Sequence, residues 1–348
     1  MERARQIKMA GVRIYLVFFA LALAAAGCDN PITSNVIQEK EYYESDAWLK
    51  IYFCPKQDCN SAMINAVNNG QESVHCAFYD LDLKDLIDAI AKKSNSADVK
   101  VIIDAENYDG QIKGSGIKIA KTNAKMHNKF CVIDHNLVLT GSTNPTNNDA
   151  HKNNNNLVIM NSEYIAENYE DEFNELWNGI YSGGNNIKYN KIHTPIGQIE
   201  NYFCPEDCAL ENNGGLYRII GLIRNAESSV KIASFSFTHE EMADELLKAD
   251  IEGINVSVLM ERRQRNVQNS QYARLKDFGL NIKIDGNKNN MHHKFIVIDN
   301  KIVITGSPNF SFSGFNRNDE NMLIIFNEQL ALGFAKEFDR LFDEGEVV

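Results

Sequence analysis

A nine-residue pattern occurs twice in this chain and constrains its fold more than any other feature. Residues 126–134 read MHNKFCVID, and residues 291–299 read MHHKFIVID. Each copy is followed by an apolar run that ends in Gly-Ser-x-Asn. A match at this many positions with the same spacing does not arise by chance. The chain therefore contains an internal duplication. The paired positions are His127, Lys129, Asp134, Gly141, Ser142 and Asn144 in the first copy and His292, Lys294, Asp299, Gly306, Ser307 and Asn309 in the second.

The two halves also share one order of expected elements. Apolar residues alternate within KFCVI and KFIVI, which predicts half-buried strands. Amphipathic segments of helical period, such as residues 83–93 and 240–250, lie between apolar strand-like runs. This alternation predicts a mixed α/β fold of two tandem layered units, at 49–185 and 196–348, joined by a Gly/Asn-rich linker. Matching motif strands predict a pseudo-two-fold arrangement with one site where the units meet.

The N-terminus has the features of an export signal. Four basic residues precede an apolar run at 14–26, which is short for a membrane-spanning helix. Small residues and Cys28 follow, which favours a lipoprotein-type signal over residues 1–27, with Cys28 carrying the lipid. Ordinary secretion and an uncleaved anchor are the alternatives. Residues 28–48 then form a polar tether, and the mature protein is expected to be exported and held at a membrane.

Cysteines are placed as expected for an exported chain. Disulfides within two local pairs are the leading interpretation, ahead of a four-thiolate zinc site or free thiols, because the spacings differ from those usual for zinc. Cys76 and Cys131 lie in apolar strand-like runs, and we expect them to be buried small hydrophobic residues rather than nucleophiles. The local pairs are Cys54 with Cys59 and Cys204 with Cys208.

The residues of the motif suit one kind of chemistry. Side chains two apart on a strand point the same way, so His127 and Lys129 share a face, as do His292 and Lys294. Face to face, two imidazoles and two ammonium groups can bind a phosphate diester and divide the roles of nucleophile and acid. Hydrogen-bond donors at the end of the following strands can contact the phosphate: Ser142, Asn144, Ser307 and Asn309.

Both sextets resemble the duplicated His-Lys-Asp signature of the phospholipase D superfamily, over about residues 49–345. The resemblance implies α-β-α layered units with one active site between them, and a metal-independent reaction without a cofactor. It implies that His127 attacks phosphorus, and that His292 protonates the leaving alcohol and then activates water. Lys129, Lys294 and the two motif asparagines would hold phosphoryl oxygens. Asp134 and Asp299 belong to the motif's catalytic set, with an orienting or structural role expected.

One departure from the family pattern concerns the residue that orients each histidine. The family often has an acidic residue after Gly-Ser-x-Asn that orients the histidine of the opposite half. Glu320 fills that position in the second half and would serve His127, whereas the first half has Asn155. An amide can fix a tautomer but cannot stabilise an imidazolium as a carboxylate does. His292 therefore lacks its usual carboxylate, unless Asp149 substitutes or Asn155 is simply tolerated.

The substrate is less constrained by the sequence than the chemistry. The net charge of −12 disfavours long nucleic acid, and an anchored enzyme would lie beside phospholipids. We therefore expect hydrolysis of phospholipids at a membrane surface by a monomer without an obligate protein partner. Alternatives are a nuclease, a phosphatidyltransferase of the cardiolipin synthase type, and a non-catalytic phosphate-binding module. Phe310, Phe312 and Phe315 could contact acyl chains or belong to the core.

Overall fold

The computed structural model describes residues 40–210 and 213–347, which belong to one compact unit. The predicted signal sequence, the lipidation site Cys28 and most of the polar tether lie outside the described residues. None of the helices within 40–210 and 213–347 combines the length and the apolar character needed to cross a bilayer.

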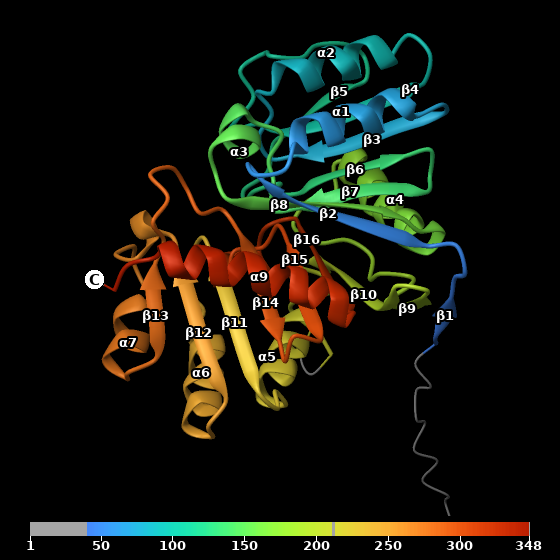
Figure 1. Ribbon diagram of the computed structural model, residues 1–348. Helices are drawn as coiled ribbons and strands as arrows, with labels where there is room; N and C mark the ends of the chain where they lie inside the picture. The colour runs from blue at the N-terminus through green and yellow to red at the C-terminus, as the bar shows by residue number, and fades with distance from the viewer. Residues whose placement is uncertain (1–39, 211–212, 348) are drawn as a thin grey trace, which may run out of the picture. The chain divides into compact units, whose positions relative to one another are not determined.

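Two mixed sheets form the centres of the two halves (Figure 1). The first has the order β2-β8-β7-β6-β3-β4-β5, and the second has the order β10-β16-β15-β14-β11-β12-β13, with β9 and β1 added beyond β10. Equivalent strands thus take equivalent places, which confirms the predicted duplicated α/β fold. The strands of the first sheet are β2 (Trp48–Cys54), β3 (Ser73–Phe78), β4 (Asp98–Asp104), β5 (Ile117–Ala120), β6 (Lys129–Ile133), β7 (Leu137–Gly141) and β8 (Asn155–Asn161). The second sheet contains β1 (Tyr42–Tyr43), β9 (Lys191–Thr194), β10 (Gly197–Cys204), β11 (Ser229–Ser234), β12 (Asn255–Met260), β13 (Asn281–Ile284), β14 (Lys294–Ile298), β15 (Ile302–Gly306) and β16 (Glu320–Phe326).

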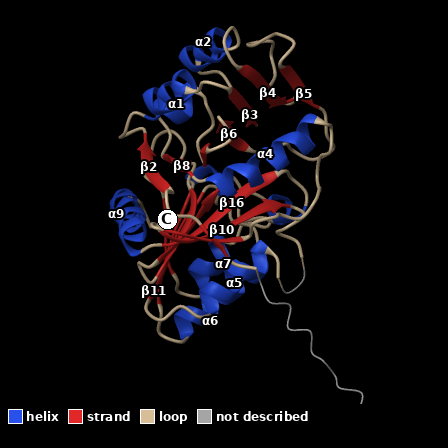
Figure 2. Cartoon of the chain, turned by 90° about the vertical axis from the view of Figure 1, so that its right-hand side faces the viewer, coloured by secondary structure: helices blue, strands red, loops and turns tan. Residues whose placement is uncertain are grey.

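Helices cover both faces of each sheet. In the second half, α5 and α6 lie on one face and α9 on the other, as Figure 2 shows. The first-half helices are α1 (Cys59–Asn69), α2 (Lys84–Lys93), α3 (Asn147–His151) and α4 (Glu163–Trp177). The second-half helices are α5 (Gly215–Arg224), α6 (Glu240–Ile251), the 3-10 turn η1 (Arg262–Gln264), α7 (Tyr272–Asp277), α8 (Phe312–Asn316) and α9 (Glu328–Glu344).

Alternation along the motif strands separates two cores in each half. Cys131 and Ile133 of β6 join the core beneath α1 and α2, whereas Phe130 and Val132 face α4. The same alternation in β14 sends Phe295 toward α9. Because successive side chains of a strand point to opposite faces, this is the expected result of the period-two pattern.

The helices α4 and α9 connect the two halves. Tyr169 of α4 packs edge-to-face on Phe203 of β10, with ring centroids 5.0 Å apart. Phe334 of α9 makes the equivalent contact with Phe53 of β2, at 5.1 Å. Three of these four aromatic side chains are buried and Phe53 is partly buried, so their packing removes much apolar area from water and fixes how the halves meet.

Three disulfides occur in the described part of the chain. Cys54 pairs with Cys59 and Cys204 pairs with Cys208. The third joins Cys76 of β3 to Cys131 of β6, which face each other across an antiparallel pair of strands. The expectation that Cys76 and Cys131 are buried is confirmed, but the expectation that they act as simple hydrophobic residues is wrong. The sequence missed this pair because the register that brings these cysteines opposite each other comes from the sheet.

Candidate active site

The two motif histidines lie at one cleft because each is bound to the opposite half. The His127 amide donates to the carbonyl of Asp319 at 2.9 Å, and the His292 amide donates to the carbonyl of Asn154 at 2.7 Å. Each bond continues a short parallel bridge formed by the preceding methionine. The start of each motif strand is therefore fixed by the other repeat, which brings both imidazoles to the seam.

His127 has the partner that the sequence predicted for it. Its Nδ1 atom lies 2.7 Å from Oε2 of Glu320, in a directed hydrogen bond. Glu320 is fully buried, and its other oxygen accepts from the Asn318 amide at 3.1 Å. With Nδ1–H donating to a carboxylate, the Nε2 atom of neutral His127 keeps its lone pair, as a nucleophile requires.

His292 has a different carboxylate partner. Oδ2 of Asp149 lies 3.2 Å from its Nδ1 atom, although the pair lacks the directed geometry of a hydrogen bond. The Asn155 side chain is instead hydrogen-bonded within its own half. Its amide donates to the carbonyls of Asp149 at 2.8 Å and Asn153 at 2.9 Å.

Both motif lysines are almost fully buried beside the histidines. Lys129 donates to the carbonyl of His127 at 2.7 Å, and Lys294 donates to the carbonyl of His292 at 3.0 Å. Each ammonium group also lies 5.2 Å from an aromatic ring centroid, that of Tyr79 for Lys129 and that of Phe235 for Lys294. Because the carbonyl and the ring do not use all of its N–H groups, each ammonium group can still donate to an anion.

Burial changes the proton affinities of these groups. It lowers the pKa of both His127 and His292 to about 4, and Glu320 and Asp149 only partly oppose this. Burial also lowers the pKa of Lys129 to about 8 and that of Lys294 well below its usual value. A bound anion favours the protonated form of all four bases, because opposite charges stabilise each other in a poorly solvated site.

The motif serines and asparagines have unequal positions. The Ser142 and Ser307 hydroxyls each accept from the main-chain amide of a strand asparagine, Asn156 and Asn321, at 3.0 Å. These serines therefore hold neighbouring strands together. Asn309 lines the cleft, whereas Asn144 donates its side-chain amide to Asp149 at 2.9 Å.

Asp134 and Asp299 lie at the far end of the motif strands, away from the histidines. The Asp134 carboxylate accepts from three consecutive main-chain amides, those of residues 71–73, and Asp299 does so from residues 227–229. Both residues have positive φ, in the turn that follows the strand. These contacts stabilise the turn and give both aspartates a structural position outside the cleft.

Several site residues belong to no recognisable motif when one half is considered alone, but equivalent residues occur in both halves. Tyr79 and Phe235 follow equivalent strands and pack edge-on against His127 and His292, at 4.6 and 4.9 Å. Asn321 reaches across the seam to Asn128, between His127 and Lys129, at 2.7 Å. Aligning the halves beyond the sextet would have found both kinds of residue.

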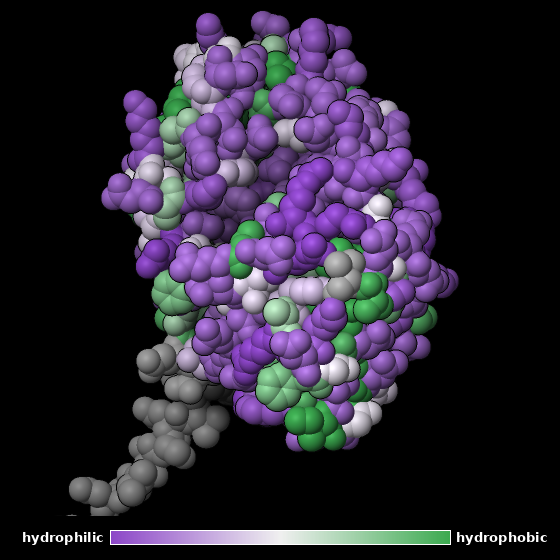
Figure 3. All heavy atoms as spheres, turned by 90° about the vertical axis from the view of Figure 1, so that its left-hand side faces the viewer, coloured by the Kyte–Doolittle hydropathy of each residue, from purple (hydrophilic) through white to green (hydrophobic). Residues whose placement is uncertain are grey.

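The cleft over the histidines has a volume of about 720 Å³. Its rim includes a trio in which Lys125 contacts Glu106 at 2.9 Å and the Tyr79 hydroxyl at 2.8 Å. The face of the molecule on the side of α3 and α7 is mostly hydrophilic in its upper part, around a hollow near the centre, and carries apolar patches in its lower part (Figure 3). Within residues 40–210 and 213–347, no cluster of three or more histidine, cysteine or acidic side chains could hold a metal ion.

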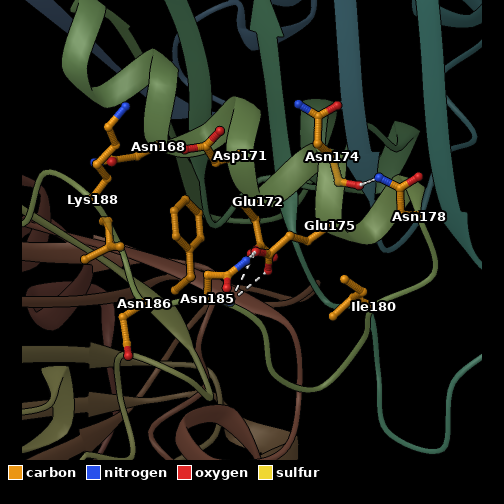
Figure 4. A pocket seen from close by; sticks show the side chains of 12 residues that line it. Asn168, Asp171, Glu172, Asn174, Glu175, Asn178, Ile180, Asn185, Asn186 and Lys188 are labelled. Carbon is orange, nitrogen blue, oxygen red and sulfur yellow. Dashed lines mark hydrogen bonds between the residues drawn. The ribbon is translucent and has the colours of Figure 1, made fainter.

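A second hollow, of about 350 Å³, lies beside α4 and is separate from the histidines (Figure 4). Amide and acidic side chains line it, among them Asp171, Glu172 and Glu175. Glu172 accepts from Asn128 at 3.2 Å, so this hollow lies directly behind the first motif strand.

The comparisons with known proteins agree with the fold and the motif. Residues 63–177 and 219–342 match the family described as "Cardiolipin synthase, PLD-like domain", so the chain belongs to the phospholipase D superfamily. A solved phosphatidylserine synthase from Haemophilus influenzae has the same fold over 86% of this chain and 87% of its own, with a TM-score of 0.68 and 12% identity.

Curated relatives match one part of the chain. A mitochondrial cardiolipin hydrolase from Chlamydomonas reinhardtii is 27% identical over 128 residues, which cover 37% of this chain and 57% of that protein. A phospholipase D from Rickettsia typhi is 28% identical over 159 residues, which cover 44% of this chain and 78% of that protein. The chain thus spans little more than half of the length of the first of these relatives.

Proposed function

We propose that this protein is a metal-independent phosphodiesterase that works through a phosphohistidine, with phospholipids as substrates. The observation that carries the proposal is the pair of buried histidines in one cleft, each with Nδ1 facing a buried carboxylate and each beside a buried lysine. Relatives named cardiolipin hydrolase and phospholipase D support a hydrolase acting on phosphodiesters.

The charges of the site fit this reaction. Two ammonium groups, Lys129 and Lys294, balance two carboxylates, Glu320 and Asp149, when both histidines are neutral. A phosphodiester adds one negative charge, which one imidazolium neutralises. The bound complex then contains one neutral and one protonated histidine, which are the nucleophile and the acid that the reaction needs.

The steps follow from these positions. Nε2 of His127 attacks phosphorus, the bond to the leaving oxygen breaks, and that oxygen takes the proton from Nε2 of His292. Water then attacks the phosphohistidine and gives a proton to His292, and the P–N bond breaks to release neutral His127. Lys129, Lys294 and Asn309 stabilise the charge on the non-bridging oxygens.

Phospholipid is favoured as the substrate by the names of the relatives and by one exposed side chain. Phe312 of α8 is 57% exposed and lies between Ser311 and Ser313, which line the cleft. Phe310 and Phe315 are buried core residues, so only Phe312 of the three remains available to acyl chains. Anchoring through Cys28 after export would hold the enzyme at a membrane surface and belongs to the same proposal.

A nuclease is the second candidate, because the second half has a basic surface near His292. Arg263 is the counterpart of Glu106, since each lies two residues after the acidic residue that binds the amide before the histidine. The guanidinium is held by neutral oxygens, those of the Asn290 side chain and the Lys288 carbonyl. Lys288 and Arg265 add positive charge on the same loops, which suits a chain of phosphates.

The deciding experiment is turnover in EDTA by the protein purified without residues 1–27. Vesicles of phosphatidylcholine or phosphatidylglycerol are compared with single- and double-stranded DNA. Release of phosphatidic acid with intact DNA is the expected result, and DNA cleavage without lipid turnover would support the nuclease. Transfer to added glycerol in place of water would indicate a phosphatidyltransferase. Binding of phosphate without any turnover would reduce the protein to a phosphate-binding module.

A further inference from the structure

We propose that Asp149 is the positioning residue for His292, and that the carboxylate serving this histidine has moved to a new place in the fold. The inference rests on the proposed function, because it assigns a role in that reaction. It is carried by the register of the two halves and by the hydrogen bonds around Asp149.

The register shows which residues correspond. Asn155 faces Cys54 in the first sheet, and Glu320 faces Cys204 in the second, so these two positions are equivalent. Thr146 and Ser311 cap the short helices α3 and α8 at equivalent points, and three residues further on Asp149 corresponds to Gly314. One half therefore has an acidic residue only at the helix position, and the other has it only at the strand position.

Each half is built for its own arrangement. A Cβ atom at Gly314 would lie 2.2 Å from the carbonyl oxygen of Asn309, so the second half has no room for a side chain there. Asn155 donates to the carbonyl of Asp149 in α3 and to that of Asn153 just after it, and a carboxylate cannot donate such bonds. The amide at 155 therefore holds the segment that carries Asp149.

Asp149 has the surroundings of an ionised carboxylate. It is buried, and its oxygens accept from the Asn144 main-chain amide at 2.8 Å, the Asn144 side chain at 2.9 Å and the Asn153 side chain at 2.6 Å. Although burial opposes it, His292 and these donors hold the pKa of Asp149 below its usual range. A fixed negative charge 3.2 Å from Nδ1 stabilises the protonated form of His292.

The arrangement also joins Asn144 to His292 through Asp149. Because the Asn144 side chain donates to the carboxylate that faces His292, a change at Asn144 is transmitted to the acid-base histidine. Asn309 has no carboxylate at the corresponding helix position and lines the cleft. The two motif asparagines thus have different roles, positioning for Asn144 and phosphate binding for Asn309.

The test compares Asp149→Asn with the matched variant of the other half, Glu320→Gln, using bis(p-nitrophenyl) phosphate in a stopped-flow instrument. This leaving group departs without protonation, so only the second step needs His292. We expect Asp149→Asn to keep a rapid release of one p-nitrophenolate per protein molecule, while steady-state turnover falls about 10- to 100-fold. Glu320→Gln should slow the rapid phase instead. Asp149→Glu should recover part of the turnover.

Unchanged turnover in Asp149→Asn, or loss of its rapid phase alone, would overturn the inference. A second measurement does not require turnover: ¹⁵N spectra of histidine-labelled protein, titrated with inorganic phosphate. Asp149→Asn should change the His292 signals and spare those of His127, and Glu320→Gln should do the reverse. A wild-type protein that forms no phosphorylated histidine in the quenched reaction would contradict the proposed function, whereas unaltered His292 signals would contradict only the role of Asp149.

Discussion

The two halves share one strand order, but an equivalent pair of glutamates, Glu172 and Glu337, lies in opposite electrostatic environments. Glu337 of α9 lies 2.5 Å from Arg340 and 3.8 Å from His293, behind the second motif strand. Glu172 of α4 takes the same place behind the first strand, but its neighbours are Asn128, Glu175 and Glu206.

The environments push the two carboxyl groups in opposite directions. Burial and the acidic Glu206 raise the pKa of Glu172 well above its usual value. Despite burial, His293 and Arg340 lower the pKa of Glu337 to about 2. The contrast shows that a duplicated fold keeps its histidines and lysines at the seam while the charges behind the motif strands diverge.

The largest expected effect separates the roles of the two histidines. His127→Ala should reduce turnover of every diester by at least about 10³-fold, because it removes the nucleophile. His292→Ala should lose a similar factor with alkyl esters, but still release one p-nitrophenolate per molecule from bis(p-nitrophenyl) phosphate. Mass spectrometry of the quenched reaction should then show a phosphorylated His127. A phosphorylated His292 in wild-type protein would reverse the assignment.

The disulfides provide the next largest difference. Ile232 and Ile296 face each other where the first half has Cys76 and Cys131. We expect Cys76→Ala with Cys131→Ala to lower the free energy of unfolding by about 2–4 kcal/mol, because the pair closes a long loop. The disulfide between Cys204 and Cys208 closes a much shorter loop, so Cys204→Ala with Cys208→Ala should lower the free energy of unfolding by less. Urea titration measures both, and a larger loss in the second double variant would contradict this ranking.

A smaller difference should appear between the two glutamates behind the motif strands. Glu337→Gln should lower the free energy of unfolding at pH 7 by about 1–3 kcal/mol, because it removes the ionised partner of His293 and leaves Arg340 with only the exposed Glu344. The pKa of Glu337 is depressed, so this contribution is present above about pH 4.5 and is lost as the pH falls toward 2. Glu172→Gln should be neutral or stabilising, and equal destabilisation by both would remove the contrast.

The smallest expected effect concerns Glu206. Burial raises the pKa of this carboxyl group to about 7, and Asp207 and Glu175 add to the shift. A carboxyl group with a raised pKa stabilises the fold below its unfolded pKa, near 4.5, and that contribution is lost as the pH rises through 7. Glu206→Gln should therefore raise stability at pH 8 by about 1–2 kcal/mol and change little at pH 4. Thermal unfolding at both values measures this, and a stabilisation that is the same at both would show that burial of the charge is not its cause.

The sequence by itself determined the duplication, the α/β class, and which histidine and lysine side chains share a face. These features follow from local rules: a strand alternates its side chains, and a motif repeated with one spacing folds into the same local structure twice. It also predicted the Glu320 partner of His127, because the family pattern gave that position.

Only the tertiary structure decided which carboxylate faces His292 and which cysteines pair across β3 and β6. Asp149 and His292 come from different halves, and Cys76 and Cys131 come from strands that lie far apart in the chain. Such contacts depend on the register within each sheet and on how the two halves meet at the seam. The packing of α4 and α9 against the opposite halves fixes how the two halves are arranged, and this arrangement cannot be read from the spacing of residues within one segment.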